Sequence, residues 1–126
     1  MHLLQITVTP WREHPVDPCG KIGCGWYLGM SPDLVHAVNR HHWDTSSELP
    51  DLIVYATSAS DPITPSTVVA LAIPTAVHGD HVPKGRYCYE GTVVSEQHPL
   101  HAQFMGKAAP LDQFRNPIRR EREYNA

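Results

Sequence analysis

Hydrophobic and polar positions follow the spacing of β-strands at four places along the chain. Residues 3–9 are rich in aliphatic and β-branched side chains and end at a proline, which predicts a strand. Residues 52–56 and 68–73 are short, continuous apolar runs typical of buried strands, and residues 87–94 alternate between two faces. These four segments predict a β-sheet.

Helical signals lie between and after these strands. Ser31, Pro32 and Asp33 supply an N-cap, a first-turn proline and a first-turn acid ahead of spaced apolar positions. We therefore expect a helix over residues 31–43. A second, short helix is expected over residues 99–105.

The order of these elements predicts the fold class. Prolines and glycines interrupt residues 10–30, so this stretch is expected to be a loop with a short strand at residues 26–28. A helix between the first strand and a run of three strands predicts an α+β domain. Its sheet should be small, curved and mixed or mostly antiparallel, or form an open β-barrel, with one or two helices. We expect one domain over residues 1–126, with residues 115–126 as a candidate flexible basic tail.

Composition and charge narrow the compartment and the partners. The apolar runs are shorter than the ~20 residues of a membrane-spanning helix, and the start of the chain lacks the layout of a signal peptide. Three cysteines are too few for a disulfide framework. These features predict a cytoplasmic protein with no membrane contact. The net charge of −3 gives no overall attraction to nucleic acid, so phosphate binding would depend on a local patch, which we place at residues 115–122.

An aromatic strand beside basic residues is the main functional feature. Tyr87 and Tyr89 are two residues apart and therefore share one face of a strand. Rings that stack a base, together with cations that hold phosphates, are the chemistry of single-stranded nucleic-acid binding. The residues that this hypothesis assigns to the base or to phosphates are Trp26, Trp43, Arg86, Tyr87, Tyr89, Lys107, Arg115 and Arg119. The alternative for each ring is packing in the core with its polar tip exposed.

The order of elements resembles the PUA-like fold. The resemblance is carried by the Trp-containing residues 25–27, the helix, the strands at 52–56 and 68–73, the Gly-Arg-aromatic strand and the closing Asn-Pro-Ile at 116–118. This group includes ASCH, EVE, SRA and YTH modules, whose members typically bind RNA or DNA and often read a modified base. The resemblance therefore implies a nucleic-acid partner. The Gly-x-Lys-x-x-Glu-x-Arg pattern of many ASCH members is absent, so no catalytic residue is transferred.

Histidine and cysteine are the candidate metal ligands of this chain. The nine histidines and three cysteines offer no ligand set with the close, paired spacing of structural zinc sites. Cys19 and Cys24 come nearest to such a pair. We expect no bound metal and no cofactor.

Two other classes of function stay open. The chain has no Gly-x-Ser-x-Gly elbow, no Walker loop and no His-Glu-x-x-His motif. A small amidohydrolase-type enzyme of the same fold would need a lysine and a glutamate beside an ordered water, and Glu90 is the carboxylate to test. An interaction or accessory domain without small-molecule chemistry, bound to a protein partner, is the other alternative.

Overall fold

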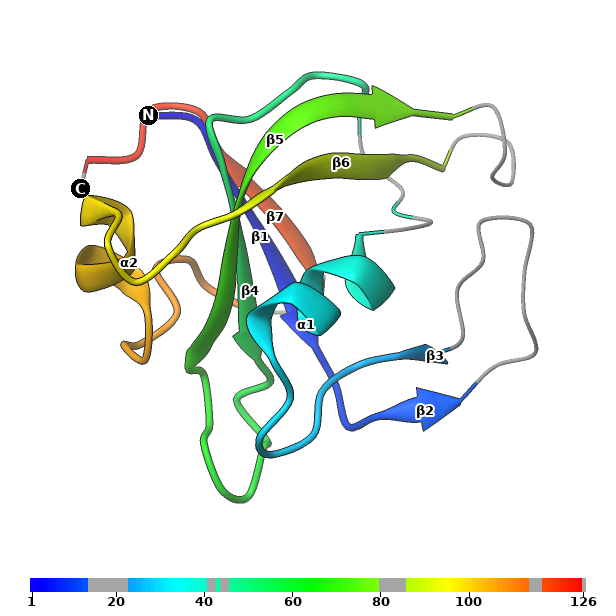
Figure 1. Ribbon diagram of the computed structural model, residues 1–126, viewed down its shortest axis with the longest axis vertical. Coiled ribbons are helices and arrows are strands. Elements are labelled where there is room, and N and C mark those ends of the chain that lie inside the picture. Colours follow the sequence, from blue (N-terminus) through cyan, green and yellow to red (C-terminus); the bar gives the residue numbers. More distant parts are fainter. Residues whose placement is uncertain (14–22, 41–42, 44–45, 80–85, 114–116, 126) are drawn as a thin grey trace.

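The computed structural model of the 126-residue chain describes residues 1–13, 23–40, 43, 46–79, 86–113 and 117–125. In chain order the elements are β1 (Leu3–Val8), β2 (Arg12–Glu13), β3 (Gly23–Cys24), α1 (Pro32–Asn39), β4 (Leu52–Thr57), β5 (Val68–His78), β6 (Cys88–Val93), α2 (Pro99–Phe104) and β7 (Ile118–Glu121). Across these described residues the strands form a five-stranded mixed sheet and a separate two-stranded ribbon (Figure 1). The expected α+β class is therefore confirmed, and the described strands do not close into a barrel.

The large sheet has the strand order β6-β5-β4-β1-β7. Its neighbours β1 and β4 run parallel, and parallel strands require a crossover connection. The chain makes that crossover between Val8 and Leu52, and α1 lies within it. All other neighbouring pairs in this sheet are antiparallel. A mostly antiparallel, mixed sheet was expected, and its parallel pair lies near the centre.

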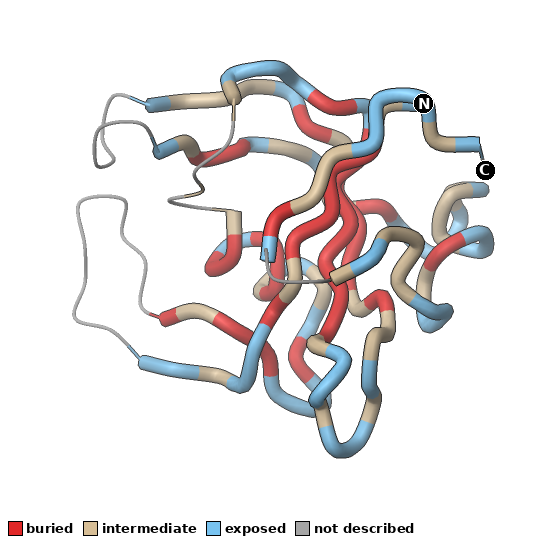
Figure 2. The backbone as a smooth tube through the Cα atoms, turned by 180° about the vertical axis from the view of Figure 1, so that it is seen from behind, coloured by how far each residue is buried: buried red, intermediate tan, exposed pale blue. Residues whose placement is uncertain are grey.

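Side chains of the sheet fill a core on each of its two faces, and Figure 2 shows the central strands buried along most of their length. On one face, Leu4 of β1 lies in a cluster with Val35 and Val38 of α1; we call this cluster the α1-side core. On the other face, Leu3 lies in a cluster with Phe104 of α2, the α2-side core. Because successive residues of a strand point to opposite faces, β1 and β4 need apolar residues at nearly every position.

The expected helix over residues 31–43 is correct at its start and too long at its end. Ser31 caps α1 as predicted, with its hydroxyl accepting a backbone N–H of the first turn. The helix ends at Asn39, and the carbonyl of Arg40 accepts a hydrogen bond from the backbone N–H of Tyr89 in β6 at 2.9 Å. Pairing with a strand is incompatible with another helical turn, so the chain leaves the helix here.

Other segments differ from expectation in extent. The short strand expected at residues 26–28 is wrong, because β3 lies earlier in the chain and Trp26 makes only an isolated bridge. β5 extends beyond the expected 68–73, since a register shift after Pro74 accommodates the missing N–H. The segment expected as a flexible tail at 115–126 contains β7, which pairs with β1. The short second helix is confirmed.

Candidate functional site

The four rings assigned to a base lie in two environments. Trp26 and Tyr89 belong to the α1-side core and are 9% and 0% exposed. Trp43 and Tyr87 are half-buried and lie against the edge of the same core. A buried ring has no face available to a ligand, so Trp43 and Tyr87 are the members of this set that can stack a base.

Trp43 and Tyr87 lie directly opposite each other in an antiparallel bridge. Each backbone N–H donates to the carbonyl of the other residue, both at 2.9 Å. Residues paired in this way project their side chains to the same side. The Trp43 indole is fixed further, because its Nε1 donates to the carbonyl of Asn39 at 2.6 Å. The Tyr87 ring lies over Gly79, where an added Cβ would stand 3.5 Å from its Cε1 atom. The bridge therefore presents two adjacent, positioned rings.

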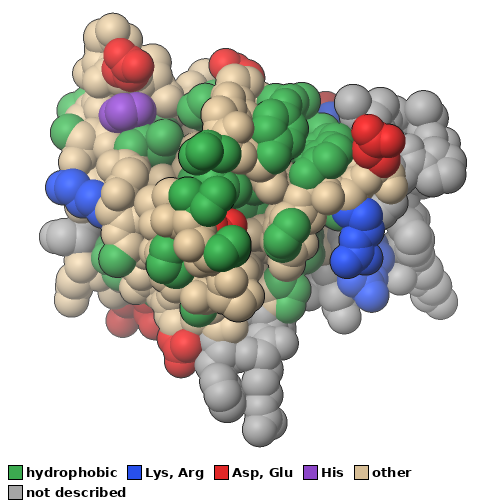
Figure 3. All heavy atoms as spheres, turned by 90° about the horizontal axis from the view of Figure 1, so that it is seen from below, with side chains coloured by type: hydrophobic (Ala, Val, Ile, Leu, Met, Phe, Trp, Pro, Cys, Tyr) green, Lys and Arg blue, Asp and Glu red, His purple; other side chains and the backbone are tan. Residues whose placement is uncertain are grey.

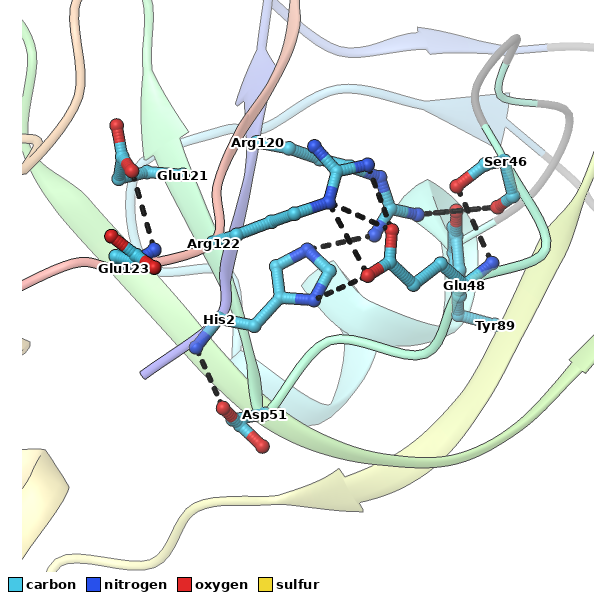
Figure 4. A network of polar contacts seen from close by, with 9 residues as sticks. All are labelled: His2, Ser46, Glu48, Asp51, Tyr89, Arg120, Glu121, Arg122 and Glu123. Atoms are coloured by element: carbon cyan, nitrogen blue, oxygen red, sulfur yellow. Dashed lines mark hydrogen bonds and ion pairs between the residues drawn. The ribbon is translucent and has the colours of Figure 1, made fainter.

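Two arginines that were not assigned individually to phosphates contact Tyr89, which lies two residues after Tyr87; one of them, Arg120, belongs to the basic segment 115–122. Arg40, at the end of α1, donates from Nη1 to the Tyr89 carbonyl at 3.3 Å. Arg120, in β7, donates from Nη2 to the Tyr89 hydroxyl at 3.0 Å and to the Ser46 carbonyl at 3.2 Å (Figure 4). Since β6 and β7 are the two edge strands of the large sheet, this contact requires a strongly curved sheet. The site consists of Trp43, Tyr87, Arg40 and Arg120, and we call it the Tyr89 site after the residue that connects them.

Of the cations selected from the sequence, Arg86 lies beside this site, while Lys107 and Arg119 do not. Arg86 is exposed and precedes Tyr87 directly, so it lies beside the ring pair. Lys107 is exposed and lies just after α2, where its carbonyl accepts a hydrogen bond from the backbone N–H of Val68 in β5 at 2.8 Å. Arg119 alternates with its neighbour in β7 and so points to the opposite face from Arg120. Arg115 lies outside the described residues. A signal for Arg120 was present in the sequence, because it shares a strand face with the apolar Ile118.

Arg120 also belongs to a polar network at the start of β1, shown in Figure 4. Its Nη1 lies 3.0 Å from Nε2 of His2. A guanidinium can only donate, so this Nε2 accepts and the proton of the neutral imidazole is on Nδ1. That Nδ1 atom lies 3.6 Å from Oε1 of Glu48, whose Oε2 is held by Arg122 at 2.8 Å. Burial, and then the charge of Arg120, lower the pKa of His2, while the hydrogen bond from Arg122 lowers the pKa of Glu48.

A second buried imidazole ties α1 to the sheet. Nδ1 of His36 lies 2.7 Å from the hydroxyl of Tyr55 in β4, and both side chains are buried in the protein. Burial, reinforced by the charge of Arg40, lowers the pKa of His36 to about 4, and burial raises the pKa of Tyr55. Both groups are therefore neutral at physiological pH. The pair serves packing, and sequence reasoning did not single it out.

The remaining acidic and metal-binding candidates give no catalytic arrangement. Glu90 is exposed, and its Oε2 lies 3.4 Å from Nε2 of His78 on the surface of the β5–β6 hairpin. Among the described residues, no three His, Cys, Asp or Glu side chains come together in a way that could hold a metal ion; Cys19 lies outside them. A hollow of about 300 Å³ opens between the start of α1 and the end of β6, and its lining includes Asp33, Glu96 and His101. None of the residues predicted to bind lines it.

Comparisons with protein-family models, with curated proteins and with solved structures find no match. In the part of the chain that the structure describes, the helices are too short or too polar to cross a membrane. The functional assignment therefore depends on the geometry of the Tyr89 site.

Proposed function

We propose that the protein is a small nucleic-acid-binding module that stacks a base of a single strand against Trp43 and Tyr87 and holds adjacent phosphates with Arg40 and Arg120. The observation that carries this proposal is the Trp43–Tyr87 bridge, which pairs two residues with half-buried rings. Stacking of a base on an aromatic ring is worth about 1–3 kcal/mol. Guanidinium groups bind phosphate oxygens in a bidentate manner, and both arginines approach the neutral oxygens of Tyr89.

The charge of the protein sets the strength of such binding. The chain carries a net charge of −3, so only local cations favour a polyanion. Two to three phosphate contacts would give modest affinity that decreases as salt rises, with a slope of roughly one log unit per phosphate. A site of this size suits a few nucleotides and not a long duplex.

The PUA-like resemblance and the reading of a modified or flipped base belong to the same proposal. The succession of strand, helix and three strands, in a sheet curved enough for its edges to meet through Arg120 and Tyr89, supports a PUA-like module. A single base held between a ring pair and arginines is the arrangement that a base-reading module requires. A cytoplasmic location is part of this hypothesis.

Titration of labelled single-stranded DNA and RNA oligonucleotides, including methylated bases, at two salt concentrations tests the proposal. Tyr87→Ala should weaken binding by about tenfold with little change in salt slope, because stacking depends weakly on salt. Arg40→Gln should also reduce the slope by about one. Lys107→Ala is the matched control, since this exposed lysine lies elsewhere, and should leave both affinity and slope unchanged. Absence of binding to every oligonucleotide at low salt would reject the nucleic-acid function.

A protein-interaction role is the second candidate, and an exposed apolar surface favours it. Tyr27, Leu28 and Ile63 are 45%, 64% and 64% exposed, and the Tyr27 ring lies edge-on to Trp11 at a centroid distance of 5.8 Å. Figure 3, which views the molecule from below, shows hydrophobic side chains across the middle of the face turned toward the viewer. Apolar surface of this kind is typical of contacts with other proteins. Leu28→Lys should then abolish any self-association seen by sedimentation, without affecting oligonucleotide binding.

A further inference from the structure

We infer that His2 makes ligand binding at Arg120 proton-linked, so that an anionic strand binds the Tyr89 site more tightly when the His2 imidazole is protonated. This inference rests on the proposed function, because its ligand is the phosphate of the bound strand. It adds a positioning residue, His2, and a pH-dependence that follows from the contacts of that residue.

The hydrogen bond between His2 and Arg120 exists only while the imidazole is neutral. Nε2 of His2 accepts from Nη1 of Arg120 at 3.0 Å, and an imidazolium has no acceptor nitrogen. Protonation would therefore place an N–H group against a guanidinium N–H group and a second positive charge beside the first. Arg120 keeps the Tyr89 hydroxyl and the Ser46 carbonyl as acceptors. A phosphate oxygen would replace the acceptor that Arg120 loses when His2 is protonated. Its negative charge would also attract both the guanidinium and the imidazolium.

Charged groups from each neighbouring segment face His2 and divide into two opposing sets. Arg120 of β7 and Arg122, which follows β7, disfavour the imidazolium. From the segment before β4, Glu48 lies 3.6 Å from Nδ1, and Asp51 accepts the His2 backbone N–H at 2.6 Å, so both favour it. Glu48 is itself held by Arg122 at 2.8 Å, which weakens its effect on His2. Partial burial also opposes the charge. Because these effects oppose one another, the added negative charge of a phosphate should shift His2 toward its protonated form.

Linkage sets the expected size of the effect and its direction. If protonation of His2 strengthens binding of an anion, binding of the anion must raise the pKa of His2 by the equivalent amount. A unit charge several ångströms from a phosphate, in mostly aqueous surroundings, changes affinity by about threefold to tenfold. Affinity should therefore rise toward that factor as the pH falls from 7.5 to 5.5 at constant ionic strength, and reach it only below the lowered pKa of His2 in the free protein.

The contact between His2 and Arg120 can be tested without any ligand. NMR titration of the His2 imidazole in the wild-type protein and in Arg120→Gln compares its pKa with and without the guanidinium. The pKa should rise in the variant, because the cation and the hydrogen bond that disfavour the imidazolium are removed. The imidazole signals of His78, which is paired with Glu90 on another surface, are the internal control and should not differ between the two proteins. An unchanged His2 pKa would overturn the inference whatever the ligand does.

Binding of a labelled single-stranded oligonucleotide at pH 7.5 and 5.5 tests the linkage itself. His2→Gln, which cannot be protonated, should lose the gain in affinity at pH 5.5, whereas His78→Gln should retain it. Equal pH-dependence in wild type and His2→Gln would reject the linkage and leave the proposed function standing. No binding at either pH would reject the proposed function, and the linkage with it, while the NMR comparison still reports on the contact.

Discussion

Burial of His36 predicts that the protein loses stability at mildly acidic pH. His36 is 7% exposed and its Nδ1 atom lies 2.7 Å from the hydroxyl of Tyr55. Burial and the nearby charge of Arg40 lower its pKa to about 4 in the folded protein, from 6.5 for an unperturbed histidine. Asp33 opposes this shift but does not cancel it. The folded state therefore binds a proton at His36 more weakly than the unfolded chain does.

The sign and the size of the effect follow from linkage. Above pH 6.5 the imidazole is neutral in both states, so its full contribution to stability is present. Between pH 6.5 and about 4 the unfolded state binds more protons, and the free energy of unfolding falls as the pH falls. At about 1.4 kcal/mol per pKa unit the total loss approaches about 3 kcal/mol, of which about 2 kcal/mol is reached at pH 5.0. His2, whose pKa is also lowered, contributes with the same sign.

Urea unfolding at pH 7.5 and pH 5.0, followed by circular dichroism, measures this loss. His36→Asn keeps an acceptor close to the position of Nδ1 and cannot be protonated. The variant should be less stable than wild type at pH 7.5, because it leaves a small cavity, but it should lose about 2 kcal/mol less between the two pH values. His78→Asn, which removes a partly exposed histidine on another surface, is the matched control for replacing a histidine by asparagine. If His36→Asn shows the same pH-dependence as wild type, the burial of a neutral His36 is refuted.

Three further substitutions and one control variant test the packing of α1 and of the β5–β6 pair, each by thermal or urea unfolding. Val38→Asp places a carboxylate in the α1-side core and should cost several kcal/mol; a melting temperature within two degrees of wild type would contradict the assigned helix face. Ser31→Ala removes the cap at 3.2 Å and should cost about 1 kcal/mol, and an unchanged stability would exclude the cap. Gly91→Ala would place a Cβ 2.6 Å from the carbonyl oxygen of Ile73 and should cost about 1–3 kcal/mol, whereas Gly79→Ala meets only ordinary contacts. Equal stability of these two glycine variants would contradict the close approach of β5 and β6.

Local patterns in the sequence were sufficient for most of the secondary structure. The cap at Ser31 and the apolar runs of β4 and β5 act through neighbouring residues, so their outcome is readable from the chain. The end of α1 depends on Tyr89 of β6, because the backbone N–H of Tyr89 donates a hydrogen bond to the carbonyl of Arg40. Strand β7 depends on β1, which is far from it in sequence. Pairing between distant segments leaves no local pattern in the sequence. For that reason the end of α1 and the presence of β7 differ from expectation.

The sequence by itself determined that Tyr87 and Tyr89 share a face, because side chains alternate along a strand, and the structure places both at the α1-side core. Only the tertiary structure decided that Tyr89 is buried while Tyr87 remains half-buried beside Trp43. It also brought Arg120 to Tyr89 and to His2, which lies 118 residues away in the chain. The contact with Tyr89 arises from the curvature of the whole sheet, which brings its two edge strands together, whereas the contact with His2 follows from the pairing of β7 with β1. No short stretch of sequence encodes either the curvature or the pairing.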